Sequence, residues 1–322
     1  MAALTIGFLM DPLETVRVDH DSTFALMLEA QKRGHQVLYF EQGWLRFNGR
    51  AAEARMRHVT VRREVGRHFD VLDEVPRELS ELDVLFLRKD PPVDVEFLHA
   101  TQMVELCPER PPVYLNHPAG IRDANEKLFS LRYADLMPDT RITRELPVLM
   151  DFIARNEQGT ILKPVDGFGG KGILFLTPGD RNARSAVELL TQGGREAVVA
   201  QAYIPESRLG DKRILMVDGD PVGGVLRVPS GDDHRGNMAA GGTPHKAVLT
   251  ARDREICERL KPELRKRGLL FVGIDVLGDY LTEVNVTSPT GVVEANLLDD
   301  VCIEAHVIDL AERLAAEQRP AR

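Results

Sequence analysis

The sequence predicts an α/β protein with two or three domains, and three features support that prediction. At 322 residues and 43% apolar residues, the chain is long enough to bury several cores. Its first part alternates strand and helix patterns, and its later part contains glycine-bearing hairpins between apolar runs. The net charge of −9 argues against nucleic-acid binding as the main task, because such binding usually needs a basic surface.

The first elements predict a βαβ unit. The apolar run 4–9 is typical of a buried strand, and residues 22–33 predict a helix that ends at Gly34. Residues 37–40 predict a second strand. We therefore expect the chain to begin with one βαβ unit.

A further strand is predicted at residues 82–87, and it ends at Arg88, where prolines follow. Ligands of open α/β sheets bind at the carboxyl ends of strands, which makes Arg88 a candidate binding residue. We expect the last strand of this domain at residues 113–115, then a turn at 116–120. The domain boundary is predicted near residue 123.

The middle segment predicts a small mixed domain. The expected helices are 125–134, 146–156 and 184–192, and the expected strands are 141–143, 173–176, 197–201 and the one that leads into the glycine loop.

The last segment predicts a hairpin and a long loop. Strands are expected at 213–217 and 221–228, joined by a turn at Asp218 and Gly219. Residues 229–243 carry almost no bulky apolar side chains, so we expect either a mobile lid or a disordered segment there. The amphipathic pattern at 300–316 predicts a helix that packs on the core or on a neighbouring subunit.

The glycine loop, residues 167–172, fits the weak GxGxxG pattern. A Rossmann loop would open a helix, but the residues that follow are a strand-like apolar run. A P-loop would need Ser or Thr after the Gly-Lys pair, and Gly172 stands there. A hairpin whose backbone N–H groups cover phosphates remains, with Lys163 as a nearby cation, and an ordinary glycine-rich hairpin is the alternative.

A second polar stretch contains Glu283 and Asn285. Side chains alternate along a strand, so these two point to one face while Val284 and Val286 point into a core. Their oxygens could bind a metal ion, and a polar strand face is the simpler interpretation.

Cysteine usage and hydropathy suggest a cytoplasmic protein. The three cysteines show no metal-binding spacing, which fits a reducing compartment. We expect no membrane-spanning segment and no signal peptide.

Several motifs together resemble the bacterial type of glutathione synthetase, an ATP-grasp ligase. The motifs lie at residues 88–92, 125–127, 162–164, 210–213, 235–237, 239–242 and 281–290. The resemblance implies an ATP-grasp fold with an N-terminal Rossmann-like domain at 1–123, a central lid domain at 124–203 and a catalytic domain at 204–322. It also implies joining of γ-glutamylcysteine to glycine, no nucleic-acid or membrane partner, and a homotetramer or homodimer.

The resemblance further implies roles for individual residues. The ATP-binding set is Lys127, Lys163, Gly167, Gly169, Gly170, Gly172, Gln201, Ala202, Tyr203, Ile204 and Asp211. The ligands of Mg²⁺, for which Mn²⁺ can substitute, would be Asp275, Glu283 and Asn285. The set implied to bind substrate is Arg88, Arg227, Arg235, Asn237, Thr287, Ser288 and Thr290, and the catalytic cations would be Arg213, Arg235 and Lys163.

The metal hypothesis makes one geometric demand. If Asp275 and Glu283 pair across a hairpin, a regular two-residue turn at Gly278 and Asp279 would put their side chains on opposite faces. We therefore predict a three-residue or otherwise bulged turn there.

Two other functions stay open at this point. Another carboxylate–amine ligase of the same fold would keep Lys127 and Lys163 but should lack the motif at 88–92. A regulatory ATP-binding protein that has lost catalysis is disfavoured, because Arg213 and the candidate metal ligands are all present.

Overall fold

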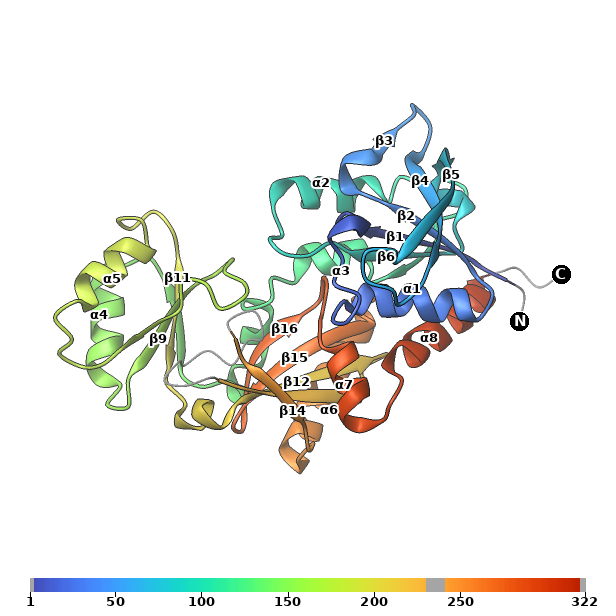
Figure 1. Ribbon diagram of the computed structural model, residues 1–322. Helices are drawn as coiled ribbons and strands as arrows, with labels where there is room; N and C mark the ends of the chain where they lie inside the picture. The colour runs from blue at the N-terminus through green and yellow to red at the C-terminus, as the bar shows by residue number, and fades with distance from the viewer. Residues whose placement is uncertain (1–2, 230–240, 319–322) are drawn as a thin grey trace.

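The computed structural model describes residues 3–229 and 241–318, and within them the strands form three sheets (Figure 1). The first has seven strands in the order β3-β4-β2-β1-β6-β7, with β5 paired to β4. The second has four in the order β10-β9-β11-β8, and the third has five in the order β14-β13-β12-β15-β16. In Figure 1 the second sheet extends to the left, while the first and third sheets lie close together.

The N-terminal sheet contains the predicted βαβ unit. Strands β1, β2, β6 and β7 are parallel, and α1 connects β1 to β2. The Asp21 carboxylate accepts a hydrogen bond from Phe24 N at the start of α1, which caps the helix. The bounds are β1 Thr5–Met10, β2 Gln36–Phe40, β3 Leu45–Phe47, β4 Ala52–Val61, β5 Phe69–Glu78, β6 Val84–Arg88, β7 Val113–Leu115, α1 Ser22–Lys32, α2 Val95–Met103 and α3 Pro118–Asp123, with 3-10 helices η1 Leu13–Thr15, η2 Gln42–Trp44 and η3 Leu79–Glu81.

The middle sheet is covered by two helices, close to the predicted positions. Its elements are β8 Thr140–Thr143, α4 Leu146–Arg155, β9 Thr160–Pro164, β10 Leu174–Leu176, α5 Ala183–Leu190 and β11 Val198–Ala202, followed by the 3-10 helix η5 Pro205–Leu209.

Two predictions near the junction were wrong. The expected turn at 116–120 is largely helix α3, which starts with Pro118 at its first helical positions, where proline is favoured. The expected helix 125–134 is a turn followed by the 3-10 helix η4, Phe129–Leu136. The reason is that Asn125 Oδ1 accepts from Lys127 N and Leu128 N, both at 3.1 Å, and so favours a turn.

The C-terminal sheet carries the predicted Asp218–Gly219 turn, in which both residues have positive φ (51° and 79°), as a tight hairpin turn requires. The expected helix 300–316 begins later, because Asp300 is left-handed and ends α7. The elements are β12 Asp211–Val217, β13 Asp220–Val228, β14 Thr243–Lys246, α6 Ala251–Lys266, β15 Phe271–Leu277, β16 Tyr280–Asn285, α7 Val292–Asp299 and α8 Ile303–Gln318.

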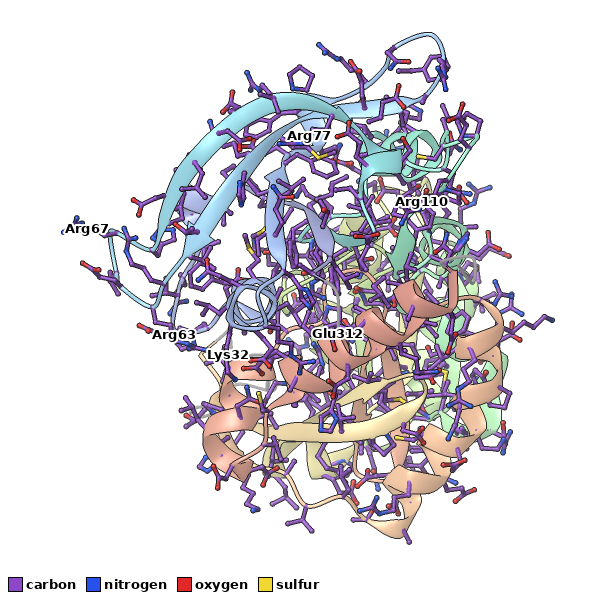
Figure 2. The ribbon with its side chains drawn as sticks, turned by 90° about the vertical axis from the view of Figure 1, so that its right-hand side faces the viewer. Lys32, Arg63, Arg67, Arg77, Arg110 and Glu312 are labelled. Carbon is purple, nitrogen blue, oxygen red and sulfur yellow. The ribbon has the colours of Figure 1, made fainter. Side chains whose placement is uncertain are left out.

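Helix α8 packs on α1 of the N-terminal part. This agrees with the prediction that it packs on the core of its own chain. Glu312 Oε1 lies 2.9 Å from His35 Nε2, and its Oε2 lies 3.1 Å from Arg33 Nη1. Figure 2 labels Glu312 on α8 and Lys32 on α1, the helix beside it. Within the described chain, no helix combines the length and apolar character needed to cross a membrane.

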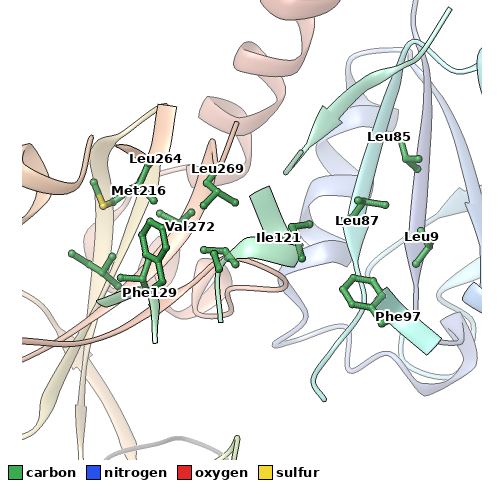
Figure 3. Packing of buried hydrophobic residues seen from close by; sticks show 14 of the residues in the cluster. Leu9, Leu85, Leu87, Phe97, Ile121, Phe129, Met216, Leu264, Leu269 and Val272 are labelled. Atoms are coloured by element: carbon green, nitrogen blue, oxygen red, sulfur yellow. The ribbon is translucent and has the colours of Figure 1, made fainter. Parts of the chain in front are cut away.

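Hydrophobic packing joins the first and third sheets. Ile121 of α3 lies between Leu87 and Phe97 on one side and Leu269 and Val272 on the other, and all belong to one cluster (Figure 3). The middle sheet has its own cluster, built around Leu149, Phe152 and Leu162. The N-terminal and C-terminal sheets are therefore packed as one body, and the middle sheet is packed separately.

Candidate active site

A cleft that is open to solvent lies between the middle and C-terminal sheets. Thirteen of the residues selected from the sequence line it: Lys127, Lys163, Gly167, Gly169, Gly170, Gln201, Ala202, Tyr203, Ile204, Asp211, Arg227, Asp275 and Glu283.

The glycine loop joins β9 to β10 over this cleft. Gly169, Gly170 and Gly172 have φ values of 63°, 77° and 72°, which favour glycine. Gly172 is not among the lining residues, and a Cβ there would lie 3.1 Å from Pro164 Cγ. Its requirement for glycine is therefore structural.

Glu283 stands between two buried lysines. Its Oε1 lies 3.2 Å from Lys163 Nζ and 3.8 Å from Lys127 Nζ, and Lys127 also donates to Gly167 O at 2.5 Å. Burial would raise the pKa of Glu283, but the two ammonium charges outweigh it and lower that pKa. The carboxylate therefore stays ionised.

Asp275 stands between two buried arginines. Arg213 donates to it through Nε at 2.5 Å and Nη2 at 3.0 Å, and Arg227 Nη2 lies 3.1 Å away. Burial would raise the pKa of Asp275, but the two guanidinium charges hold it well below its usual range. Arg227 also donates to Asp211, whose pKa is raised because burial outweighs that contact.

A bulge in the β15–β16 hairpin puts Asp275 and Glu283 on one face. The turn has two residues, Gly278 and Asp279, but the register shifts by one residue so that Thr282 is extra and Asp275 pairs with Glu283. The predicted three-residue or bulged turn is absent, but the extra residue that the pairing requires is present in strand β16. Val284 and Val286 are fully buried, also as predicted.

The oxygen atoms of three side chains suit a hard divalent ion whose other ligands come from a bound phosphate group. In the described ranges, no group of three or more His, Cys, Asp or Glu side chains could form an all-protein metal cage. Asp275, Glu283 and Asn285 offer two carboxylates and one amide oxygen on neighbouring strands. Mg²⁺ is commonly bound by one or two carboxylates together with phosphate oxygens, so these residues fit such an ion.

Arg88 lies outside the cleft, at the end of β6, and is 3% exposed. Nη2 donates to Pro289 O at 2.9 Å and Nε to Thr23 Oγ1 at 3.1 Å, whereas Nη1 is buried with no partner. Burial lowers the pKa of Arg88 to about 10. A buried guanidinium with a free donor is suited to binding a carboxylate.

Arg88 brings the turn 287–290 to the N-terminal sheet. Thr287 is buried, Ser288 is partly exposed and Thr290 is exposed, and Thr290 O lies 3.4 Å from Arg213 Nη1. Arg235 and Asn237 lie outside the described residues, as does the lid segment from 230 to 240.

Two features of the site were missed in the sequence. Ile161, Ile173 and Leu277 form an apolar wall of the cleft. Ile161 could have been found by alternation, because it is two residues from Lys163 on the same strand. Glu126, beside Lys127, has its pKa raised to about 7 by burial and by the charge of Glu283, which lies 157 positions later and gives no local signal.

Solved structures share this architecture. D-cycloserine synthetase DcsG aligns with a TM-score of 0.65 at 16% identity, covering 96% of this chain and 99% of that one. The ATP-grasp ligase PsnB aligns with a TM-score of 0.64 at 17% identity, covering 99% and 100%. The chain therefore has the fold of the ATP-grasp ligases.

Sequence relatives give the particular family. Residues 4–122 match the prokaryotic glutathione synthetase N-terminal domain, and 126–300 match the ATP-grasp domain of the same family. The glutathione synthetase of Brucella melitensis is 45% identical, over 96% of this chain and 99% of that one. The one from Escherichia coli K12 is 40% identical, over 98% and 100%. The chain belongs to the prokaryotic glutathione synthetase family, and its activity is the ATP-dependent ligation that forms glutathione, with a divalent metal.

Proposed function

We propose that the protein activates the cysteinyl carboxylate of γ-glutamylcysteine with ATP and joins it to glycine. A carboxylate oxygen attacks the γ-phosphorus, so that an acyl phosphate forms and ADP leaves. The glycine amine then attacks the acyl carbon, phosphate leaves, and the amine proton passes to solvent. The observation that supports this best is the arrangement in which Glu283 and Asp275 are each shared between two buried cations.

We assign the phosphates to Lys127, Lys163 and the backbone N–H groups of the glycine loop. The two lysines are buried and positively charged, which favours an anion over water, and the N–H groups of the loop could donate to phosphate oxygens. The adenine would lie against Ile161, Ile173 and Leu277, next to Gln201–Ile204. When the phosphates bind, Lys163 and Lys127 would contact phosphate oxygens instead of the Glu283 carboxylate.

Asp275, Glu283 and Asn285 would hold Mg²⁺, for which Mn²⁺ can substitute. When bound, the ion neutralises charge on the β- and γ-phosphates. Arg213 and Arg227 keep Asp275 ionised, and they would be free to turn to phosphate or substrate oxygens when the ion takes their place.

The peptide would lie on the N-terminal side of this centre. We assign its carboxylates to Arg88 and Arg227, and its remaining polar groups to Thr287, Ser288 and Thr290. The unpaired Nη1 of Arg88 supports this assignment. Arg235 and Asn237, in the expected lid 229–243, complete the proposed set.

We propose three domains, at 1–123, 124–203 and 204–322, of which the central one closes over ATP. Its separate hydrophobic core supports movement as a unit. We further propose a homotetramer or homodimer in the cytoplasm. Exposed Val71, Leu72 and Val75 on edge strand β5 support association, and the free cysteines fit a reducing compartment.

Oxygen transfer tests the proposed chemistry. With γ-glutamylcysteine labelled by ¹⁸O in the cysteinyl carboxylate, the inorganic phosphate released should carry one ¹⁸O atom, because that oxygen bridges to phosphorus in the acyl phosphate. Unlabelled phosphate alongside labelled tripeptide would contradict the acyl-phosphate route.

A further inference from the structure

Asn116, directly after β7, connects the N-terminal sheet to the C-terminal sheet through its side chain. It is 3% exposed. Its Nδ2 donates to Phe271 O and Val286 O, and its Oδ1 accepts from Leu270 N and Phe271 N, each at 2.7 Å. The two donors and the acceptor of this amide are all used, so its orientation is fixed by its partners.

The partners of Asn116 lie beside the reaction centre. Phe271 begins β15, the strand that carries Asp275, and Leu270 directly precedes it. Val286 follows Asn285 and precedes Thr287, so its carbonyl marks the point where β16 ends and the turn 287–290 begins. The amide therefore fixes both strands of the hairpin at the end nearest that turn.

Arg88 contacts the same region from the neighbouring strand. Strands β6 and β7 are adjacent and parallel, so their carboxyl ends lie at one edge of the sheet. Arg88, at the end of β6, donates to Pro289 O and lies over the Phe271 ring at 5.2 Å. Two buried side chains from adjacent strand ends thus hold the turn 287–290 at Val286 and Pro289.

We infer that Asn116 is a positioning residue that fixes the peptide-binding turn 287–290 against the N-terminal sheet. The inference rests on the proposed function, which assigns this turn and Arg88 to the peptide. We expect little effect on the nucleotide, because the glycine loop and Ile161 belong to the middle sheet, which has its own core, and Leu277 lies at the end of β15 remote from Asn116. Loss of the amide should therefore weaken binding of the peptide far more than binding of the nucleotide.

The test compares Asn116→Asp and Asn116→Ala with Asn156→Asp. The aspartate keeps both acceptor bonds and loses both donors, and alanine loses all four bonds without adding a charge. Asn156 is a matched control, since its Nδ2 donates to a backbone carbonyl, Phe152 O at 2.6 Å, far from the turn. We expect the KM for γ-glutamylcysteine to rise about tenfold in the Asn116 variants, with the Kd of nucleotide within about twofold and the control unchanged in both.

Hydrogen exchange provides a readout that does not depend on substrate. The amides of Thr287, Ser288 and Thr290 should exchange faster in the Asn116 variants than in the wild type or in Asn156→Asp. Unchanged KM and unchanged exchange in a folded Asn116 variant would overturn the inference, and so would failure of both variants to fold, because Asn116 would then determine the fold. A wild-type protein that does not join the peptide to glycine would instead overturn the proposed function, and the exchange result would still decide whether Asn116 fixes the turn.

Discussion

At the scale of residues, the site holds its charges as shared ion pairs. Glu283 lies between Lys163 and Lys127, and Asp275 lies between Arg213 and Arg227. Buried ions need partners, and removing one partner leaves the other uncompensated. Binding of nucleotide and metal would let every one of these groups change partner without leaving a charge unpaired.

Replacement of the shared carboxylate tests this arrangement. Glu283→Gln should lower kcat by at least about 100-fold, because the amide cannot supply a charged ligand to the metal. Steady-state turnover and urea unfolding would be measured together, with the neighbouring turn variant Asp279→Asn as control. Near-normal turnover in a folded Glu283→Gln protein would rule out Glu283 as a metal ligand.

Glu126 predicts a dependence of stability on pH. Its pKa is raised from 4.5 to about 7, so the folded protein keeps this proton over a range in which the unfolded chain loses it. Ionisation of Glu126 therefore lowers the free energy of unfolding as pH rises from about 4.5 to about 7. Above about pH 7 this destabilisation is complete.

Glu126→Gln should remove the destabilisation caused by ionisation of Glu126. Without nucleotide or metal, the variant should gain about 2 kcal/mol over the wild type at about pH 8 and much less at about pH 5. Urea unfolding at both values measures the difference. A gain that is the same at both pH values would show that Glu126 does not titrate in this way.

At the scale of elements, the glycine loop owes its shape to residues with positive φ. Gly169→Ala places a Cβ at φ 63° in a residue that lines the cleft, and should raise the KM for ATP about tenfold through strain of about 1–2 kcal/mol. Gly179→Ala introduces a similar strain at φ 79°, where a Cβ meets no atom within 4 Å, and is the matched control. Equal effects of the two variants on the KM would contradict a role of the loop in binding phosphates.

The pattern of apolar residues along the sequence predicted most helices and strands. It failed where an element depends on pairing with a strand that is distant in the sequence. Strands β1, β9 and β12 follow from apolar runs, and the parity argument correctly required an irregular β15–β16 hairpin. The position of the bulge at Thr282 was not predictable, because it depends on packing across the sheet. The charged strands β4 and β5 pair mainly with each other and were missed for the same reason.

Site residues with a local sequence signal were predicted, and those that depend on distant contacts were not. The residues of the glycine loop and strand β16 were found from their spacing or by resemblance, and the structure brings most of them to one cleft. No role was predicted for Glu126 or Asn116. Glu283, whose charge acts on Glu126, and Val286, which accepts from Asn116, are far away in the chain. Only the folded chain brings these pairs together.

At the scale of the whole molecule, helix α8 ties the end of the chain to its beginning. Glu312, buried on α8, contacts both His35 and Arg33 near the end of α1. Glu312→Gln should lower the free energy of unfolding by about 1–3 kcal/mol with unchanged KM values, because it removes a buried charge partner far from the cleft. The exposed Glu317→Gln should change it by less than about 0.5 kcal/mol. An equal effect of both in urea unfolding would show that the α1–α8 contact does not stabilise the fold.

The central claim is that the cleft between two sheets ligates γ-glutamylcysteine to glycine at the expense of ATP. The most direct measurement is ADP release with Mg²⁺-ATP, γ-glutamylcysteine and glycine, with each component omitted in turn and the product identified by mass. We predict that release requires every component and yields one tripeptide per ADP. ADP release that does not depend on glycine, or a product of any other mass, would contradict the account.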